Sequence, residues 1–245
     1  MDARTTKIEI RGLKRSFKAL QVVGGIDLAV APGEFVAIVG PSGCGKSTLM
    51  KLLAGFEHPD SGAVSIDGVP VTRPSPNAIV ISQHGSVFPW LTVRENLMFG
   101  LSGKDNPAKV ATADHYAEMV GLKGFEKSYP HELSGGMLKR VEIARALAVK
   151  PDILLMDEPF SALDALTALK MRNELLRVLR EERHTVILIT HDVEEAIYLA
   201  DRVVVLSPRP TTIQSVFPIA QPHPRKVSQP ELQQTKDAIL AQLGL

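Results

Sequence analysis

The chain has 245 residues, of which 44% are hydrophobic and 22% charged, and this is enough apolar material for the core of one large domain. The formal net charge is +1, which gives no electrostatic support to nucleic-acid binding, and a single cysteine excludes an internal disulfide. Residues 1–12 lack the apolar segment of a signal peptide. No apolar run reaches the roughly 18 residues of a membrane-spanning helix, so we expect any membrane role to depend on a partner.

The first part of the chain alternates short β-type runs with turn signals. A run of five apolar residues at 35–39 predicts a buried strand, and the segment that follows the loop after it predicts a helix at 46–54. Asp67–Gly68 is typical of a hairpin turn. The other predicted strands cover residues 7–10, 26–30, 63–66 and 78–82.

The pattern becomes helical from about residue 93 to 149, with the clearest periodicity at 108–120 and 136–149. Strands and helices then alternate, with strands at 153–156, 185–190 and 203–206 and helices at 164–183 and 193–200. This alternation predicts an α/β domain with a largely parallel sheet. We place that domain at residues 1–210, with a helical subdomain inserted at about 93–149. Residues 211–245 form a proline-rich C-terminal tail, expected to be irregular apart from a short helix at 231–243.

A glycine-rich loop follows the buried strand at 35–39 and precedes a helix. It fits the pattern G-x-x-x-x-G-K-[ST], in which backbone N–H groups and the positive end of the helix hold phosphate oxygens. We expect Lys46 to bridge the β- and γ-phosphates of a nucleotide, Ser47 to bind Mg²⁺ and Thr48 to donate to the α-phosphate. The loop comprises Gly40, Pro41, Ser42, Gly43, Cys44, Gly45, Lys46, Ser47 and Thr48.

Two carboxylates, Asp157 and Glu158, directly follow the predicted strand at 153–156. This is the carboxyl end of a parallel sheet, where α/β folds bind their ligands. Asp157 is the candidate Mg²⁺ partner, and Glu158 is then available as the general base that polarises an attacking water. Without the phosphate loop, the same pair could be a solvated strand end.

The sequence Leu133-Ser134-Gly135-Gly136 precedes a helix and resembles the signature of ABC ATPases. In that family the signature caps the ATP held by the other subunit of a dimer, and so the resemblance implies a homodimer or a paired ATPase subunit. It also implies a P-loop NTPase core with a mostly parallel sheet, an N-terminal antiparallel β subdomain and an inserted helical subdomain. ATP and Mg²⁺ are the implied cofactors.

Further positions resemble the family in the expected order along the chain. Gln83 is similar to the glutamine that senses Mg²⁺ and the γ-phosphate side, and His191 is similar to the histidine that contacts the γ-phosphate. Residues 161–164 (Ser-Ala-Leu-Asp) resemble the segment at the dimer seam. Phe17 resembles the aromatic residue that stacks on adenine, although it could instead belong to the core. Met137 departs from the family, in which many members have glutamine there.

The chain also resembles a narrower group, the importer ATPases for nitrate, sulfonate and taurine. The residues that carry this resemblance are Met137, Phe88-Pro-Trp90 and Ser207-Pro-Arg-Pro210. It implies an ATP-hydrolysing subunit that powers import of a small anionic solute. The implied partners are transmembrane permease subunits and, indirectly, a periplasmic or lipid-anchored substrate-binding protein, with no nucleic acid. The implied location is the cytoplasmic face of the plasma (inner) membrane, as a peripheral protein. We expect Trp90 to anchor the permease, unless Trp90 and Phe88 pack into the helical subdomain's own core.

Two other functions compete with this interpretation. The first is a soluble, non-transport ABC ATPase acting in DNA repair or on the ribosome, and the near-zero net charge argues against it. The second is a small-molecule kinase with the same phosphate loop, which would leave Ser134–Gly136 and His191 without a role.

Overall fold

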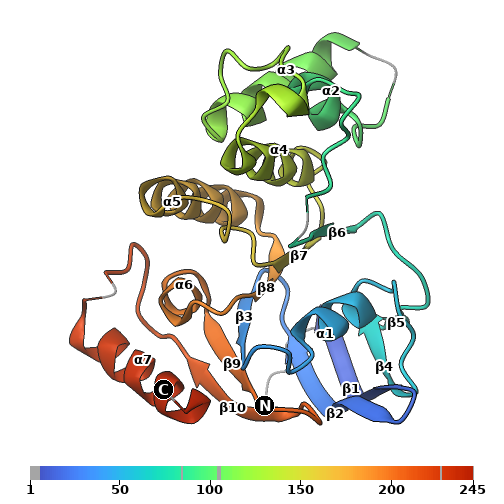
Figure 1. Ribbon diagram of the computed structural model, residues 1–245, viewed down its shortest axis with the longest axis vertical. Helices are drawn as coiled ribbons and strands as arrows, with labels where there is room; N and C mark the ends of the chain where they lie inside the picture. Colours follow the sequence, from blue (N-terminus) through green and yellow to red (C-terminus); the bar gives the residue numbers. More distant parts are fainter. Residues whose placement is uncertain (1–5, 84, 104–105, 227, 245) are drawn as a thin grey trace.

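The computed structural model describes residues 6–83, 85–103, 106–226 and 228–244. Residues 1–5, part of the segment for which we predict no signal peptide, lie outside the described residues. Figure 1 shows three parts: a central sheet with helices beside it, a smaller sheet at one side, and a group of helices at the top. Among the described residues, no helix is long and apolar enough to cross a bilayer.

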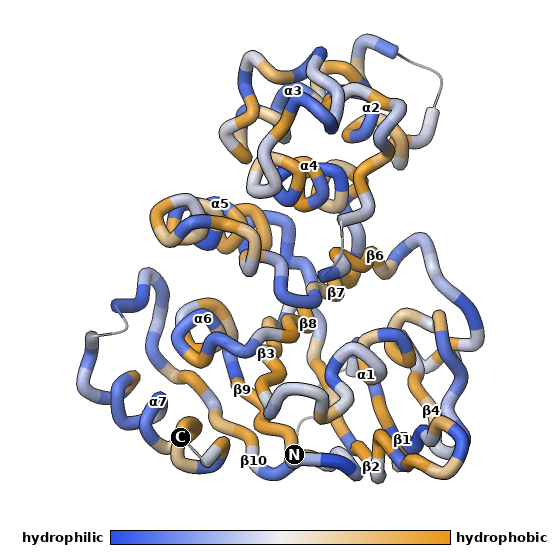
Figure 2. Tube along the Cα trace, in the orientation of Figure 1, coloured by the Kyte–Doolittle hydropathy of each residue, from blue (hydrophilic) through white to orange (hydrophobic). Residues whose placement is uncertain are grey.

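The central sheet has six strands in the order β10-β9-β3-β8-β7-β6. All neighbouring pairs are parallel except β9 and β10. β3, β7 and β8 are buried along their whole length, as their continuous apolar sequences predict, and they are among the most hydrophobic segments in Figure 2. The strands are β3 (Phe35–Val39), β6 (Ala78–Ile81), β7 (Ile153–Asp157), β8 (Thr185–Ile189), β9 (Arg202–Leu206) and β10 (Ile213–Pro218).

Successive side chains of these strands point to opposite faces and enter two separate cores. In β3, Val36 and Ile38 pack with α1 (Lys46–Leu53) and with the smaller sheet. Ala37 and Val39 pack on the other face, in the core that includes α4 to α7. The sheet is therefore a central layer that is covered on both of its faces.

The smaller sheet is antiparallel, with the order β2-β1-β4-β5. Asp67 and Gly68 have φ values of 50° and 76°, so both adopt the left-handed conformation of the predicted hairpin turn. This confirms the predicted N-terminal antiparallel subdomain. Its strands are β1 (Ile8–Phe17), β2 (Leu20–Val30), β4 (Ser61–Ile66) and β5 (Val69–Pro70).

The helical subdomain comprises α2 (Val93–Met98), α3 (Asn106–Met119), a 3₁₀ turn (Pro130–Glu132) and α4 (Gly135–Ala148), which lie together in Figure 1. Thr92 and Glu95 form a capping box at the start of α2, a helix that the sequence analysis did not delimit. Ser134 caps α4, because its Oγ accepts a hydrogen bond from the backbone N–H of Met137 at 3.3 Å.

The C-terminal region departs from the prediction of an irregular tail. β10 pairs antiparallel with β9, and α7 (Pro230–Leu243) packs against α6 (Val193–Leu199) through the buried Leu232 and Ile239. Prolines on either side of β10 obscured it, yet proline is tolerated at the ends of an edge strand. The prediction of irregularity was thus wrong for residues 213–218, whereas the domain boundary at residue 210 stays a prediction. The remaining helix, α5 (Ala165–Glu182), matches the predicted one closely.

Candidate nucleotide site

A cavity of about 790 Å³ lies where the carboxyl ends of β7 and β8 meet the phosphate loop and the tip of the β1–β2 hairpin. It brings together most of the predicted site residues, which come from segments far apart in the sequence. The parallel register explains this convergence, because β7 and β8 end side by side, with Asp157 opposite Ile189. The lining residues are Phe17, Leu20, Val22, Ser42, Gly43, Gly45, Lys46, Ser47, Thr48, Gln83, Asp157, Glu158, His191 and Arg209.

The phosphate loop is held in shape by its own lysine and by close packing. Lys46 is buried, and its Nζ donates to the carbonyl oxygens of Gly40 and Pro41 at 2.8 and 2.9 Å. Gly45 has a φ of 124°, and a Cβ at this position would lie 2.7 Å from Cγ1 of Val22. Only glycine therefore fits at position 45, both for the backbone conformation and for space.

The carboxylates after β7 differ in their surroundings. Burial raises the pKa of Asp157, against the opposing effect of a hydrogen bond from the Ser47 side chain. This contact joins two of the three residues predicted to bind Mg²⁺, Ser47 and Asp157; the third, Gln83, lines the same cavity. A hydroxyl beside a carboxylate suits a hard cation that takes its remaining oxygen ligands from phosphate and water. The described residues contain no cluster of three or more His, Cys, Asp or Glu side chains that could hold a metal without such help.

Glu158 lies at the centre of a second set of contacts. Its φ of 48° is uncommon for a residue other than glycine, and this conformation turns the side chain out of the strand direction and into the cleft. The side-chain amide of Gln83 donates to Oε2 at 3.1 Å, and Nδ1 of His191 lies 3.1 Å from Oε1. A carboxylate oriented from both sides in this way can accept a proton from a water bound between it and a phosphate.

Phe17, at the end of β1, lines the opposite side of the cleft. Its side chain is 42% exposed, and the guanidinium of Arg15 lies 4.9 Å from the centre of its ring. The core role left open by the sequence is therefore wrong for Phe17. An exposed aromatic face at the rim can stack on a base.

Other predicted residues do not line the cleft. Gly40 and Cys44 belong to the phosphate loop but are buried on the side away from the cavity, and Cys44 is only 2% exposed. Ser134 and Gly135 are exposed at the start of α4, and residues 134–136 are absent from the described lining of the cavity. A Cβ on Gly136 would lie 3.2 Å from Leu163, so the signature and the 161–164 segment are neighbours.

The structure adds residues that the sequence analysis did not assign to the site. Arg209 lies against the loop, with Nη2 3.0 Å from the place of a Cβ on Gly43. Thr211 is buried, and its hydroxyl donates to the carbonyl of Cys44. Leu20 and Val22 contribute apolar lining. The segment 207–210 was noticed in the sequence, but only its position after β9 brings it to the phosphate loop.

The family follows from comparison with known proteins. A family model described as an ABC transporter matches residues 23–161. The chain belongs to the ABC transporter family. As a member of it, the protein is an ATP-binding subunit that hydrolyses ATP, which removes the small-molecule kinase from consideration.

Curated relatives match nearly the whole of this ABC ATPase. It is 47% identical over 221 residues to an ATP-binding protein of Brucella abortus, a match that covers 89% of this chain and 85% of that one. It is 42% identical over 240 residues to an aliphatic sulfonates import ATP-binding protein of Bacillus subtilis, which covers 98% and 94% of the two chains.

Solved structures give the same picture for the fold. A bacterial ABC transporter cassette whose structure is dimeric superposes with a TM-score of 0.80 at 28% identity, over 87% of this chain and 99% of that chain. The same cassette in a post-hydrolysis state with ADP and Pi gives a TM-score of 0.78 at 27% identity. These matches agree with the P-loop core, the antiparallel subdomain and the inserted helical subdomain expected from the sequence.

Proposed function

We propose that this ABC ATPase works as a pair of identical copies that drive a membrane importer. The observation that carries the proposal is the separation of Ser134–Gly136 from the cleft that contains Lys46, Asp157 and Glu158. The signature of one copy would therefore contact the nucleotide that is bound in the cleft of a second copy. Its N–H groups and serine hydroxyl at the start of α4 then bind a terminal phosphate. The dimeric cassette to which the chain is similar supports this arrangement.

Within each composite site, we assign roles from the contacts described above. The phosphate loop from Gly40 to Thr48 binds the phosphates, Lys46 leaves its loop carbonyls for the β- and γ-phosphates, and Phe17 stacks on adenine. Ser47, Asp157 and Gln83, which line the cleft together, would hold Mg²⁺, and the ion would neutralise charge on the phosphates.

Hydrolysis itself then depends on Glu158. A water held by this carboxylate gives up its proton to Glu158 as its oxygen bonds to the γ-phosphorus, while the bond to the leaving ADP oxygen breaks. His191, which lies beside Glu158, would donate a hydrogen bond to the γ-phosphate as negative charge redistributes. Phosphate and ADP share the site after the step, and their repulsion reopens the pair of subunits.

A groove on the helical side offers a place for the permease. A cavity of about 340 Å³ is lined in part by Phe56, Phe88 and Phe99, and Trp90 is 70% exposed at a ring-centre distance of 5.6 Å from Phe88. Exposure of Trp90 excludes the alternative in which it packs into the subdomain's own core. Clustered exposed aromatic side chains are typical of protein interfaces. We assign this groove to a cytoplasmic helix of the permease.

The transported solute is proposed from relatives alone. Several are aliphatic sulfonates import ATP-binding proteins, and this supports import of a small anionic solute such as a sulfonate, taurine or nitrate. A periplasmic or lipid-anchored protein would deliver that solute, and the ATPase would lie on the cytoplasmic face of the membrane, bound to its permease.

Mixing two inactive variants tests the shared site. Ser134→Arg blocks the signature and Lys46→Ala disables the phosphate loop, so neither alone should hydrolyse ATP. A mixed pair contains one intact site, made of the Ser134→Arg copy's loop and the Lys46→Ala copy's signature, and should regain hydrolysis. If mixing restores nothing and Mg·ATP leaves hydrolysis-dead protein monomeric, both alone and with its permease, the paired mechanism is wrong. Co-purification of the tagged wild-type chain with ribosomes rather than with a permease would favour a non-transport ABC ATPase.

A further inference from the structure

The signature helix α4 carries an ion pair on its buried face. Nζ of Lys139 lies 3.1 Å from Oε2 of Glu142, and the two side chains are only 5% and 2% exposed. Lys and Glu are rarely buried so fully, because loss of water costs more than the pair regains unless further hydrogen bonds satisfy both groups. The remaining contacts of this pair therefore indicate what it is for.

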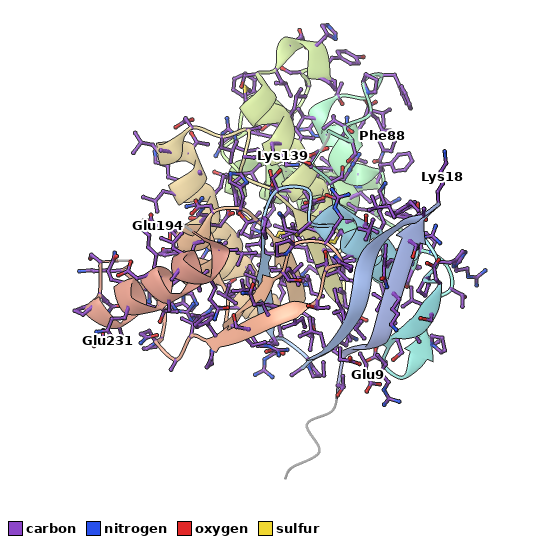
Figure 3. The ribbon with its side chains drawn as sticks, turned by 60° about the horizontal axis from the view of Figure 1, so that its bottom comes forward. Glu9, Lys18, Phe88, Lys139, Glu194 and Glu231 are labelled. Carbon is purple, nitrogen blue, oxygen red and sulfur yellow. The ribbon has the colours of Figure 1, made fainter. Side chains whose placement is uncertain are left out.

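Among the described residues, the hydrogen bonds that the pair makes to other parts of the chain lie on the segment that follows β6. Lys139 donates to the carbonyl oxygen of Ser82 at 2.5 Å, and Glu142 accepts a hydrogen bond from the backbone N–H of Ser86. One turn further along the helix, Nη2 of Arg145 donates to Oγ of Ser86 at 2.7 Å. Lys139, Glu142 and Arg145 are spaced i, i+3, i+6 and so share one face of α4. This face binds the segment at Ser82 and again at Ser86. Figure 3 shows Lys139 inside the molecule, at the base of the helical subdomain.

Gln83 lies between these two attachment points. Its side chain is exposed, and its amide donates a 3.1 Å hydrogen bond to Oε2 of Glu158. An exposed side chain on a loop is not fixed by packing, and so its position depends on where the backbone on either side is held.

We propose that Lys139 and Glu142 are positioning residues for ATP hydrolysis, which tie Gln83 to the signature helix. The pair makes the distance from Gln83 to Glu158 follow the position of α4. When Ser134 at the start of that helix engages the partner's nucleotide, Gln83 is set in place in its own site by the same helix. The inference rests on the role proposed above for Gln83 beside Glu158.

The test compares two double variants in steady-state hydrolysis. Lys139→Met/Glu142→Leu removes both charges of the pair together, so neither of the two is left buried without the other. We expect kcat to fall about 10- to 100-fold, as for other small displacements of a catalytic group, with KM for ATP and thermal stability little changed. Lys139→Gln/Glu142→Gln retains a donor for Ser82 and an acceptor for Ser86, and should restore most of kcat even if the apolar variant folds poorly. The control is Lys123→Met/Glu118→Leu, which removes an exposed pair of the same subdomain.

A second step places each change in a Gln83→Ala background. If the pair acts through Gln83, the apolar double substitution should lower kcat no further there. If the apolar double substitution and Gln83→Ala lower kcat by factors that multiply, the inference is wrong. It is also wrong if Gln83→Ala alone lowers kcat while the apolar double variant keeps the wild-type kcat. If Gln83→Ala itself hydrolyses ATP at the wild-type rate, the proposed role of Gln83 is wrong and the positioning role falls with it.

Discussion

Nδ1 of His191 lies 3.1 Å from Oε1 of Glu158, although the two residues are 33 positions apart in the sequence. Glu158 follows β7 and His191 follows β8, and these two parallel strands are neighbours that end side by side. A hydrogen bond from the backbone N–H of Glu158 to the carbonyl of Ile189 fixes the two strand ends at 2.8 Å. The relative position of the candidate base, Glu158, and its neighbour, His191, is thus determined by the register of the sheet. Changes to either side chain should therefore act directly on the site.

Glu158→Gln keeps the shape of the side chain but removes its capacity to take a proton. We expect ATP binding to persist and kcat to fall by about 10²- to 10⁴-fold, the usual contribution of a general base. Single-turnover phosphate release and equilibrium ATP binding separate the two effects. Glu174→Gln, on an exposed part of α5, is the matched control. Wild-type turnover in Glu158→Gln would remove this residue from the role of base.

Lys46→Ala should weaken nucleotide binding itself. The lysine is already buried in the loop and, on binding, exchanges two carbonyl contacts for charged phosphate oxygens. Losing a charge-assisted hydrogen bond of about 1.5–3 kcal/mol corresponds to a Kd higher by roughly 10- to 150-fold. Titration with ATP measures this, with Lys51→Ala on the exposed side of α1 as the control. Equal affinity of Lys46→Ala and wild type would contradict the assignment.

Phe17→Ala should reduce affinity for ATP while leaving affinity for inorganic triphosphate unchanged, because only ATP presents a base to stack. Stacking of a base on an aromatic side chain contributes about 1–3 kcal/mol, and Phe17→Tyr should retain it. Phe56→Ala, at an exposed aromatic residue outside the cleft, is the control. Equal losses for ATP and triphosphate would point to a distorted loop instead of a lost stack.

Trp90→Ala should leave hydrolysis by the isolated subunit intact and weaken its assembly with the permease. Truncation of an aromatic anchor at the centre of an interface commonly lowers affinity by about 10- to 100-fold. Affinity for the reconstituted permease and stimulation of hydrolysis by it are the two measurements. Phe125→Ala, exposed elsewhere in the helical subdomain, should have neither effect. Normal assembly and normal stimulation of Trp90→Ala would end the proposal for the groove.

The helical subdomain is also joined to α5 by Glu182, which accepts a hydrogen bond from Tyr116 at 3.0 Å and contacts His184 and Lys150 at 2.7 and 3.2 Å. Burial alone would raise the pKa of Glu182, but these hydrogen bonds outweigh it and lower the pKa below its ordinary 4.5. The stability that Glu182 contributes is therefore present above pH 4.5 and is lost as the pH falls through the lowered value.

Glu182→Gln should accordingly lower the free energy of unfolding at pH 7 by about 1–2 kcal/mol. Chemical denaturation across pH should show the difference from wild type shrinking below pH 4.5. Glu181→Gln, whose exposed side chain pairs with Arg177, provides the comparison and should show little change. A difference for Glu182→Gln that is the same at all pH values would exclude the ionised carboxylate as its cause.

The local sequence was sufficient to predict the structure wherever a motif and the elements on either side of it are adjacent in the chain. The run at 35–39 became β3 with the predicted bounds, and the loop at 40–48 follows it directly, because five consecutive apolar residues can only be satisfied by burial on both faces. β10 escaped prediction because its side chains alternate between partly buried and exposed and its stabilising partner, β9, is a tertiary one.

The sequence by itself determined the chemistry of this protein: a loop for phosphates, a carboxylate pair after a buried strand, and a serine–glycine cap on a helix. Those depend on short segments whose spacing fixes their geometry. Only the tertiary structure decided which distant groups act on them, such as Arg209 and Thr211 against the phosphate loop and Lys139 with Glu142 behind Gln83. Long-range contacts of this kind are selected by packing and by the need to satisfy buried polar groups, neither of which leaves a local pattern in the chain.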